Sequence, residues 1–82
     1  MRGGKEMNLK DAAILSKVQV VGISAKGSLR RRFFDLGIIE GTKIEVLFEG
    51  ALGDPIAYLI RGSIIAIRKE DSNKIQVKTI AK

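Results

Sequence analysis

The strongest chemical signal in the sequence is the run RRRFF at residues 30–34, where three arginines precede two phenylalanines. Guanidinium groups bind carboxylates and phosphates, and arginine and aromatic side chains are enriched at protein interfaces. Three interpretations fit this run: the solvated face of a helix, a surface for an acidic protein partner, and a nucleic-acid surface. The net charge of +6 favours anionic partners in general and does not choose between them.

The residue types argue against catalysis and metal binding. The 82-residue chain has no histidine and no cysteine, so it lacks the usual proton shuttle and the imidazole and thiolate ligands. The carboxylates are scattered, and Glu70 and Asp71 are the only adjacent pair. The P-loop pattern is absent, and the glycines of residues 50–54 (GALGD) are typical of a turn. We therefore predict a non-enzymatic protein with no catalytic residue, no metal site and no cofactor.

A short helix is needed to present the arginines. The sequence predicts one at about residues 28–36, with Ser28 as N-cap and Gly37 as a left-handed C-cap. At 100° per residue, one stripe of this helix is apolar and faces the core. Its members are Leu29, Phe33 and Leu36.

The same helix turns its remaining large side chains outward. Arg30 and Arg31 are expected to face solvent, and Phe34 lies near Arg30, away from the core stripe. Exposed arginines near a helix N-terminus oppose the helix dipole by about 0.3–1 kcal/mol each. Because local rules are often broken where a surface is used, we predict that Arg30, Arg31 and Phe34 bind a partner.

Short strands separated by glycine-rich turns account for most of the remaining chain. A β-branched run predicts a strand near residues 18–23, and alternation at residues 43–48 places Ile44, Val46 and Phe48 in the core. A hairpin and a closing strand follow, with a short helical turn near residues 69–73 between them. The pattern favours a mostly β fold, a small antiparallel barrel of about five strands.

The predicted hairpin around Gly62 supplies a second candidate surface. Its outward residues are apolar, and they are Ala57, Leu59, Ile64 and Ala66. A contiguous exposed apolar patch usually marks a contact, so Leu59 and Ile64 are further candidates for binding a partner or a second copy. A one-residue shift in strand register would instead bury these side chains.

Three segments together resemble the FeoA family, small cytosolic proteins of bacterial ferrous iron transport. The segments are RRRFFDLGIIEG, ALGDPIAYLIRG and IIAIRKED, followed by the closing KIQV. The family pattern falls on Arg32, Phe33, Leu36, Gly37, Ile38 and Gly41, then Leu52, Gly53, Asp54 and Pro55, then Ile65, Ile67 and Arg68. The resemblance runs from about Leu9 to Ile80, nearly the whole chain.

The resemblance implies an SH3-like barrel and a cytoplasmic accessory or regulatory role through contact with FeoB, the membrane transporter with a GTP-binding domain. The glycine pair near the start predicts a flexible tail at residues 1–7, and the chain length fits a single FeoA-like domain at residues 8–82. Two alternatives stay open: a basic barrel that binds nucleic acid, and a stand-alone relative of the SH3-like domain of iron-dependent repressors. One tyrosine, three phenylalanines and no tryptophan make nucleic acid the less favoured partner.

Overall fold

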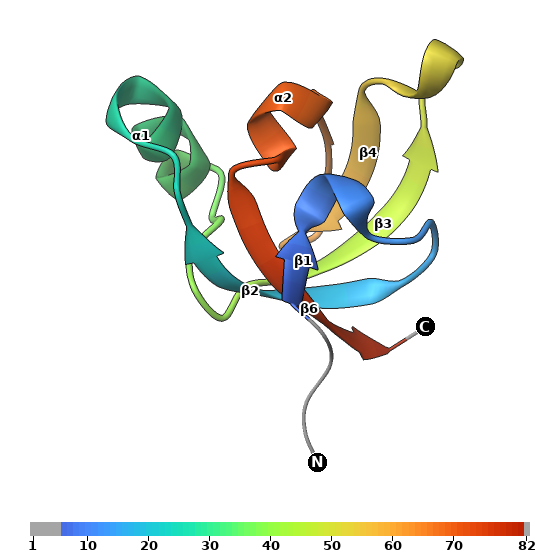
Figure 1. The fold of residues 1–82 in the computed structure, drawn as a ribbon, viewed down its shortest axis with the longest axis horizontal. Coiled ribbons are helices and arrows are strands. Elements are labelled where there is room, and N and C mark those ends of the chain that lie inside the picture. Colours follow the sequence, from blue (N-terminus) through green and yellow to red (C-terminus); the bar gives the residue numbers. More distant parts are fainter. Residues whose placement is uncertain (1–5, 82) are drawn as a thin grey trace.

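The computed structural model describes residues 6–81, in which six antiparallel strands form one sheet in the order β1-β6-β2-β3-β4-β5. The strands curve around a core, with α1 at one side and α2 above the open end (Figure 1). The strands are β1 (Glu6–Asn8), β2 (Lys17–Ile23), β3 (Lys43–Glu49), β4 (Ile56–Ile60), β5 (Ser63–Ile67) and β6 (Ile75–Ala81). The helices are α1 (Gly27–Asp35), α2 (Lys69–Ser72) and the 3₁₀ turns η1 (Leu9–Asp11) and η2 (Ala51–Gly53).

The core is formed by the inward faces of the strands and the inner stripe of α1. Alternation along the strands places β-branched side chains on the concave face, as the sequence predicts. Its largest fully buried members are Tyr58, Phe33, Leu9, Ile38, Ile44, Ile60, Ile67, Ile75, Val18, Val20, Val46 and Val77. The mostly β architecture with one main helix is therefore confirmed.

The two ends of α1 differ in how well the sequence predicted them. The helix ends in the motif expected from Gly37, whose φ is +86°. The amide of Gly37 donates to Phe34 O at 3.0 Å, and the amide of Ile38 donates to Phe33 O at 2.9 Å. The N-cap assignment was wrong, because Lys26 occupies that position with no side-chain cap and Ser28 lies inside the helix.

The strand count is six rather than five because a short strand precedes the predicted ones. Glu6, Met7 and Asn8 form β1, which pairs with Lys78, Val77 and Gln76 of β6. This strand is only three residues long and has no clear alternation, which hides it in the sequence. Of the predicted tail at residues 1–7, residues 1–5 lie outside the described residues, and the last two belong to β1.

Phe48 was predicted in the core and is not there. Its side chain is 57% exposed, because the register of β3 against β4 shifts between Val46 and Phe48. Val46 pairs with the buried Tyr58, but Phe48 pairs with Ala57 on the outer face. The extra residue of this bulge reverses the alternation at the end of β3.

The β4–β5 hairpin keeps the predicted register. Leu59 pairs with Ile64, and the two-residue turn at Arg61 and Gly62 has φ values of +50° and +83°, as a type I′ turn requires. One prediction here was wrong, because Ala57 is buried rather than exposed. It pairs with Phe48, and a large aromatic neighbour on the same face covers so small a side chain.

Candidate functional site

The outer face of α1 brings together the three residues that the sequence singled out. Arg30, Arg31 and Phe34 are all exposed, and the Phe34 side chain is 68% accessible to solvent. The opposite face of the helix buries Phe33 and packs Leu29 and Leu36 partly against the core. Burial of that stripe fixes the orientation of the helix and therefore the outward direction of the charged face.

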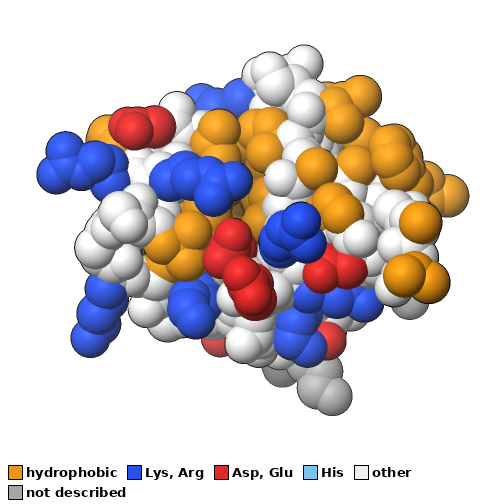
Figure 2. Space-filling model, turned by 90° about the horizontal axis from the view of Figure 1, so that it is seen from above, with side chains coloured by type: hydrophobic (Ala, Val, Ile, Leu, Met, Phe, Trp, Pro, Cys, Tyr) orange, Lys and Arg blue, Asp and Glu red, His pale blue; other side chains and the backbone are white. Residues whose placement is uncertain are grey.

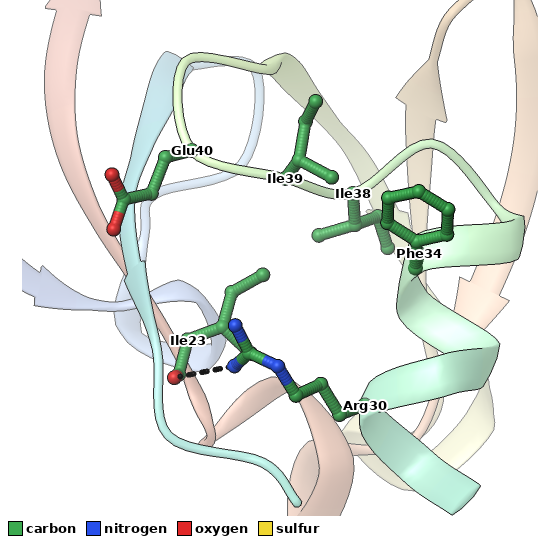
Figure 3. A pocket seen from close by; sticks show the side chains of 6 residues that line it. All are labelled: Ile23, Arg30, Phe34, Ile38, Ile39 and Glu40. Atoms are coloured by element: carbon green, nitrogen blue, oxygen red, sulfur yellow. Dashed lines mark hydrogen bonds between the residues drawn. The ribbon is translucent and has the colours of Figure 1, made fainter.

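A small pocket opens beside this face. It has a volume of about 140 Å³, close to the ~150 Å³ of an engineered cavity that holds one benzene molecule. Arg30 extends from α1 toward Ile23 on one side of the opening, and residues of the loop after the helix line the other side (Figure 3). The lining residues are Ile23, Arg30, Phe34, Ile38, Ile39 and Glu40.

Arg30 holds the pocket in shape. Its Nη1 donates to the carbonyl oxygen of Ile23 at 3.2 Å, which ties α1 to the last residue of β2. A shallower groove lies on the other side of Arg30 and Phe34, and it is bordered by Gly27, Arg31 and Asp35. The exposed ring of Phe34 therefore separates two hollows, each with an arginine at its rim.

The charge on this face is largely uncompensated. Arg32 lies 4.0 Å from Asp71 of α2, but neither Arg30 nor Arg31 forms an ion pair within residues 6–81. Seen from above, basic side chains spread over the end of the molecule that carries α1, and hydrophobic side chains gather at the opposite end (Figure 2). The pocket has four apolar lining residues together with Arg30 and Glu40, so it is suited to an apolar side chain flanked by charged groups.

The described part of the chain offers no group of three or more histidine, cysteine, aspartate or glutamate side chains that could hold a metal ion. No helix among residues 6–81 is long and apolar enough to cross a membrane. The α1 face itself offers one aromatic ring, two arginines and a hollow lined mostly by apolar side chains.

The second pair of candidates, Leu59 and Ile64, lies on different elements from the first. These two residues face each other across β4 and β5, where Ile64 is 65% exposed and Leu59 is half-buried. The turn of this hairpin reaches the end of α1, because Arg61 Nε donates to the carbonyl oxygen of Gly37 at 3.1 Å. The structure thus presents two candidate surfaces, not one.

Three residues of the α1 pocket escaped the sequence analysis. Ile23, Ile39 and Glu40 come from the end of β2 and the loop after α1, and only the fold brings them to Arg30 and Phe34. The consecutive isoleucines Ile38 and Ile39 could have indicated an exposed apolar residue here. Two consecutive isoleucines after a left-handed glycine cannot both enter the core, and Ile38 is the one that is fully buried.

A comparison with protein families decides what kind of chain this is. The model of the FeoA domain family matches residues 7–79, almost the full length. The chain belongs to the FeoA domain family. The NMR structure of a FeoA-like protein from Clostridium acetobutylicum has a TM-score of 0.85 and 35% identity, covering 100% of this chain and 93% of that one.

Two other proteins that are similar to this chain carry FeoA or Fe(2+) transport protein A in their names. The NMR structure of the FeoA protein from Chlorobium tepidum has a TM-score of 0.85 and 32% identity, covering 92% of this chain and 71% of that one. A fusion protein of Fe(2+) transport protein A and the Fe(2+) transporter FeoB from Porphyromonas gingivalis is 29% identical over 92% of this chain. This chain spans only 9% of the length of the fusion protein.

The fold extends beyond the family. The crystal structure of IdeR from T. acidophilum has a TM-score of 0.80 over 98% of this chain and 37% of that one, at 16% identity. That likeness shows a shared SH3-like fold and nothing more. The TM-scores of 0.85 to the two FeoA structures confirm the fold that the resemblance implied.

Proposed function

We propose that this protein is a non-enzymatic, cytoplasmic accessory protein of ferrous iron uptake that acts by direct contact with a FeoB-type transporter. The observation that carries the proposal is the Porphyromonas relative, in which one chain joins a FeoA segment to FeoB. Two proteins that are fused in one organism commonly work in contact when they are separate chains in another. FeoA is an accessory transport and regulatory domain and not a known enzyme family.

The contact is assigned to the outer face of α1. An exposed aromatic ring, an apolar pocket and unpaired arginines are the features that make interface hot spots. Phe34 supplies the ring, and Arg30 and Arg31 supply charge for carboxylates on the partner. Rim charges of this kind raise the association rate more than they lengthen the life of the complex.

A titration of the ¹⁵N-labelled protein with the soluble cytosolic part of the transporter tests this assignment. At near-physiological salt, amide shifts are expected to concentrate on α1 and on Ile23, Ile39 and Glu40, which line its pocket. Shifts confined to the Leu59 and Ile64 hairpin would move the contact to the second surface. No shifts with the cytosolic part or with detergent-solubilised transporter would contradict the proposal.

Two variants with matched controls locate the contact more sharply. Phe34→Ala is expected to weaken binding about thirtyfold or more, because removing an aromatic hot spot typically costs about 2 kcal/mol or more. Leu52→Ala is its control, since Leu52 is another exposed large apolar side chain but lies in η2, away from α1. Arg31→Glu is compared with Lys17→Glu, which makes the same charge change at the start of β2.

Nucleic acid is the competing partner for a basic surface, and the same labelled protein tests it. Binding to DNA or RNA would weaken steeply with rising salt, in proportion to the number of phosphates contacted. Shifts on α1 with nucleic acid and none with the transporter would favour the basic-barrel alternative over the accessory role.

A further inference from the structure

The edge strand β5 has unusual residues for its position. It closes one side of the sheet and pairs only with β4 among the described strands. Edge strands are normally protected by charges, proline or bulges, because their free amide and carbonyl groups are a template for another strand. The sequence of β5 is SIIAI, with no charge and no proline, and its pairing with β4 has no bulge.

The hairpin register shows which backbone groups of β5 are free. In a hairpin closed by a two-residue turn, the pair next to the turn is hydrogen-bonded and the pairs then alternate. Ile60 and Ser63 are that first pair, so Ser63, Ile65 and Ile67 direct their amide and carbonyl groups to β4. The amide and carbonyl groups of Ile64 and Ala66 therefore point away from the sheet.

The side chains of the same two residues form an exposed apolar surface. Ile64 is 65% accessible and Ala66 is exposed, on the outer face that they share with Leu59. The bulge in β3 adds Phe48 to this face, since Phe48, Ala57 and Ala66 lie in one row across three strands. A strand added to β5 would extend both the hydrogen-bond ladder and this apolar face.

The charges at the two ends of β5 indicate what kind of segment would pair with this edge. Arg61 precedes the strand and Arg68 follows it, and neither forms an ion pair within residues 6–81. A second copy in antiparallel pairing, centred on Ile65, would bring Arg61 opposite Lys69 and add to the repulsion between two chains of net charge +6. A segment with carboxylates at its ends would instead find an arginine at each end.

We propose that the open edge of β5 binds an extended segment of a partner protein by strand addition. The segment has about five residues, with apolar side chains in alternation and carboxylates at both ends. Its backbone bonds to the free groups of Ile64 and Ala66, its apolar side chains pack beside Ile64 and Ala66 on the outer face, and its carboxylates meet Arg61 and Arg68. The surface is separate from the α1 face and does not depend on which protein carries the segment.

A synthetic probe tests the backbone contact. The acetylated heptapeptide Glu-Val-Thr-Val-Thr-Val-Glu is titrated into the ¹⁵N-labelled full chain at low salt, and amide exchange is then measured. Slower exchange of the Ile64 and Ala66 amides, with that of Ile65 unchanged, is the expected result, because Ile65 is already bonded to β4. No protection at millimolar peptide, or protection on α1 instead, would overturn the proposal.

Control peptides and variants separate the charge and edge contributions. Replacing both glutamates of the peptide by lysine is expected to weaken binding about fivefold, the effect of two exposed ion pairs. Ile64→Asp should abolish binding, whereas Leu52→Asp, at an even more exposed apolar residue outside the sheet, should not. Equal affinity for both peptides would overturn the assigned charge preference. Concentration-dependent dimers that protect Ile64 and Ala66 without peptide would show that the edge belongs to a second copy.

Discussion

Arg61 and Gly37 form a close contact between the β4–β5 turn and the end of α1. The Nε of Arg61 donates to the carbonyl oxygen of Gly37 at 3.1 Å. A Cβ built on Gly37 would lie 2.5 Å from Cδ of Arg61. Two features therefore favour glycine at this position. Its φ of +86° is unfavourable for other residues, and the Arg61 side chain occupies the space that a Cβ would need.

Substituting Gly37 by alanine is expected to lower the free energy of unfolding by more than the left-handed backbone alone accounts for. The backbone contribution is about 1–2 kcal/mol, and displacement of Arg61 adds up to about 1 kcal/mol through the lost hydrogen bond. The matched control is Gly41→Ala, because Gly41 has a φ of +92° and nothing within 4 Å of its Cβ position. Urea unfolding measures both variants, and equal losses would show that the Arg61 contact contributes nothing.

Truncation of two phenylalanines of this chain should lower stability by very different amounts. Phe33 is fully buried, so Phe33→Ala is expected to cost about 3–5 kcal/mol of unfolding free energy. Phe48 is 57% exposed on the outer face, so Phe48→Ala should cost less than about 1 kcal/mol. Thermal and urea unfolding measure both. A loss at Phe48 as large as that at Phe33 would place its ring in the core and contradict the β3 bulge.

Phe48 also shows which part of the core could not be predicted from the sequence. Alternation correctly predicted the buried face of β3 at Ile44 and Val46, because a pleated strand with one buried face has a period of two. The bulge that reverses Phe48 depends on how β3 pairs with β4, which no local pattern encodes. The core residues of β3 were therefore predictable only as far as Val46, where the regular pairing of β3 with β4 ends.

The candidate site was predictable to a similar extent. Arg30, Arg31 and Phe34 follow from helical periodicity, since a single helix fixes their relative directions. The pocket beside them also needs Ile23 from β2 and Ile39 from the following loop. Those residues meet α1 only because the sheet curves, and such a long-range approach has no signature in the spacing of residues.

Asp54 connects the loop after η2 to the start of α2. Its Oδ1 accepts a hydrogen bond from the amide of Lys69 at 2.9 Å, while the N-cap residue Arg68 provides no side-chain cap. Asp54→Ala is therefore expected to lower the unfolding free energy by about 1 kcal/mol, the usual effect of losing a cap. Asp54→Asn keeps an acceptor oxygen and should lose less than half of that. If both variants lost the same amount by urea unfolding, the charge and not the hydrogen bond would be what stabilises α2.

Tyr58 places a hydroxyl in the core with no hydrogen-bond partner among the described residues. The side chain is fully buried, and the hydroxyl of the neighbouring Ser72 donates its own hydrogen bond to the carbonyl oxygen of Lys69 at 3.4 Å. Burial raises the pKa of Tyr58 above its usual value of 10.0, the charges of Asp54 and Asp11 add to the rise, and Ser72 opposes it. At neutral pH, Tyr58→Phe is expected to leave stability unchanged or to increase it by about 1 kcal/mol, because an unsatisfied polar group is removed.

The pH dependence gives this prediction its sign. Above pH 10 the unfolded chain loses the Tyr58 proton while the folded chain keeps it, so the native protein should lose up to about 1.4 kcal/mol of stability per pH unit through this group. The loss begins at the unfolded pKa and ends at the higher folded pKa. Tyr58→Phe lacks this contribution, and the difference in unfolding free energy between the two proteins should widen from pH 9 to pH 11. A constant difference across that range would mean that the hydroxyl finds a partner or reaches solvent in the folded protein.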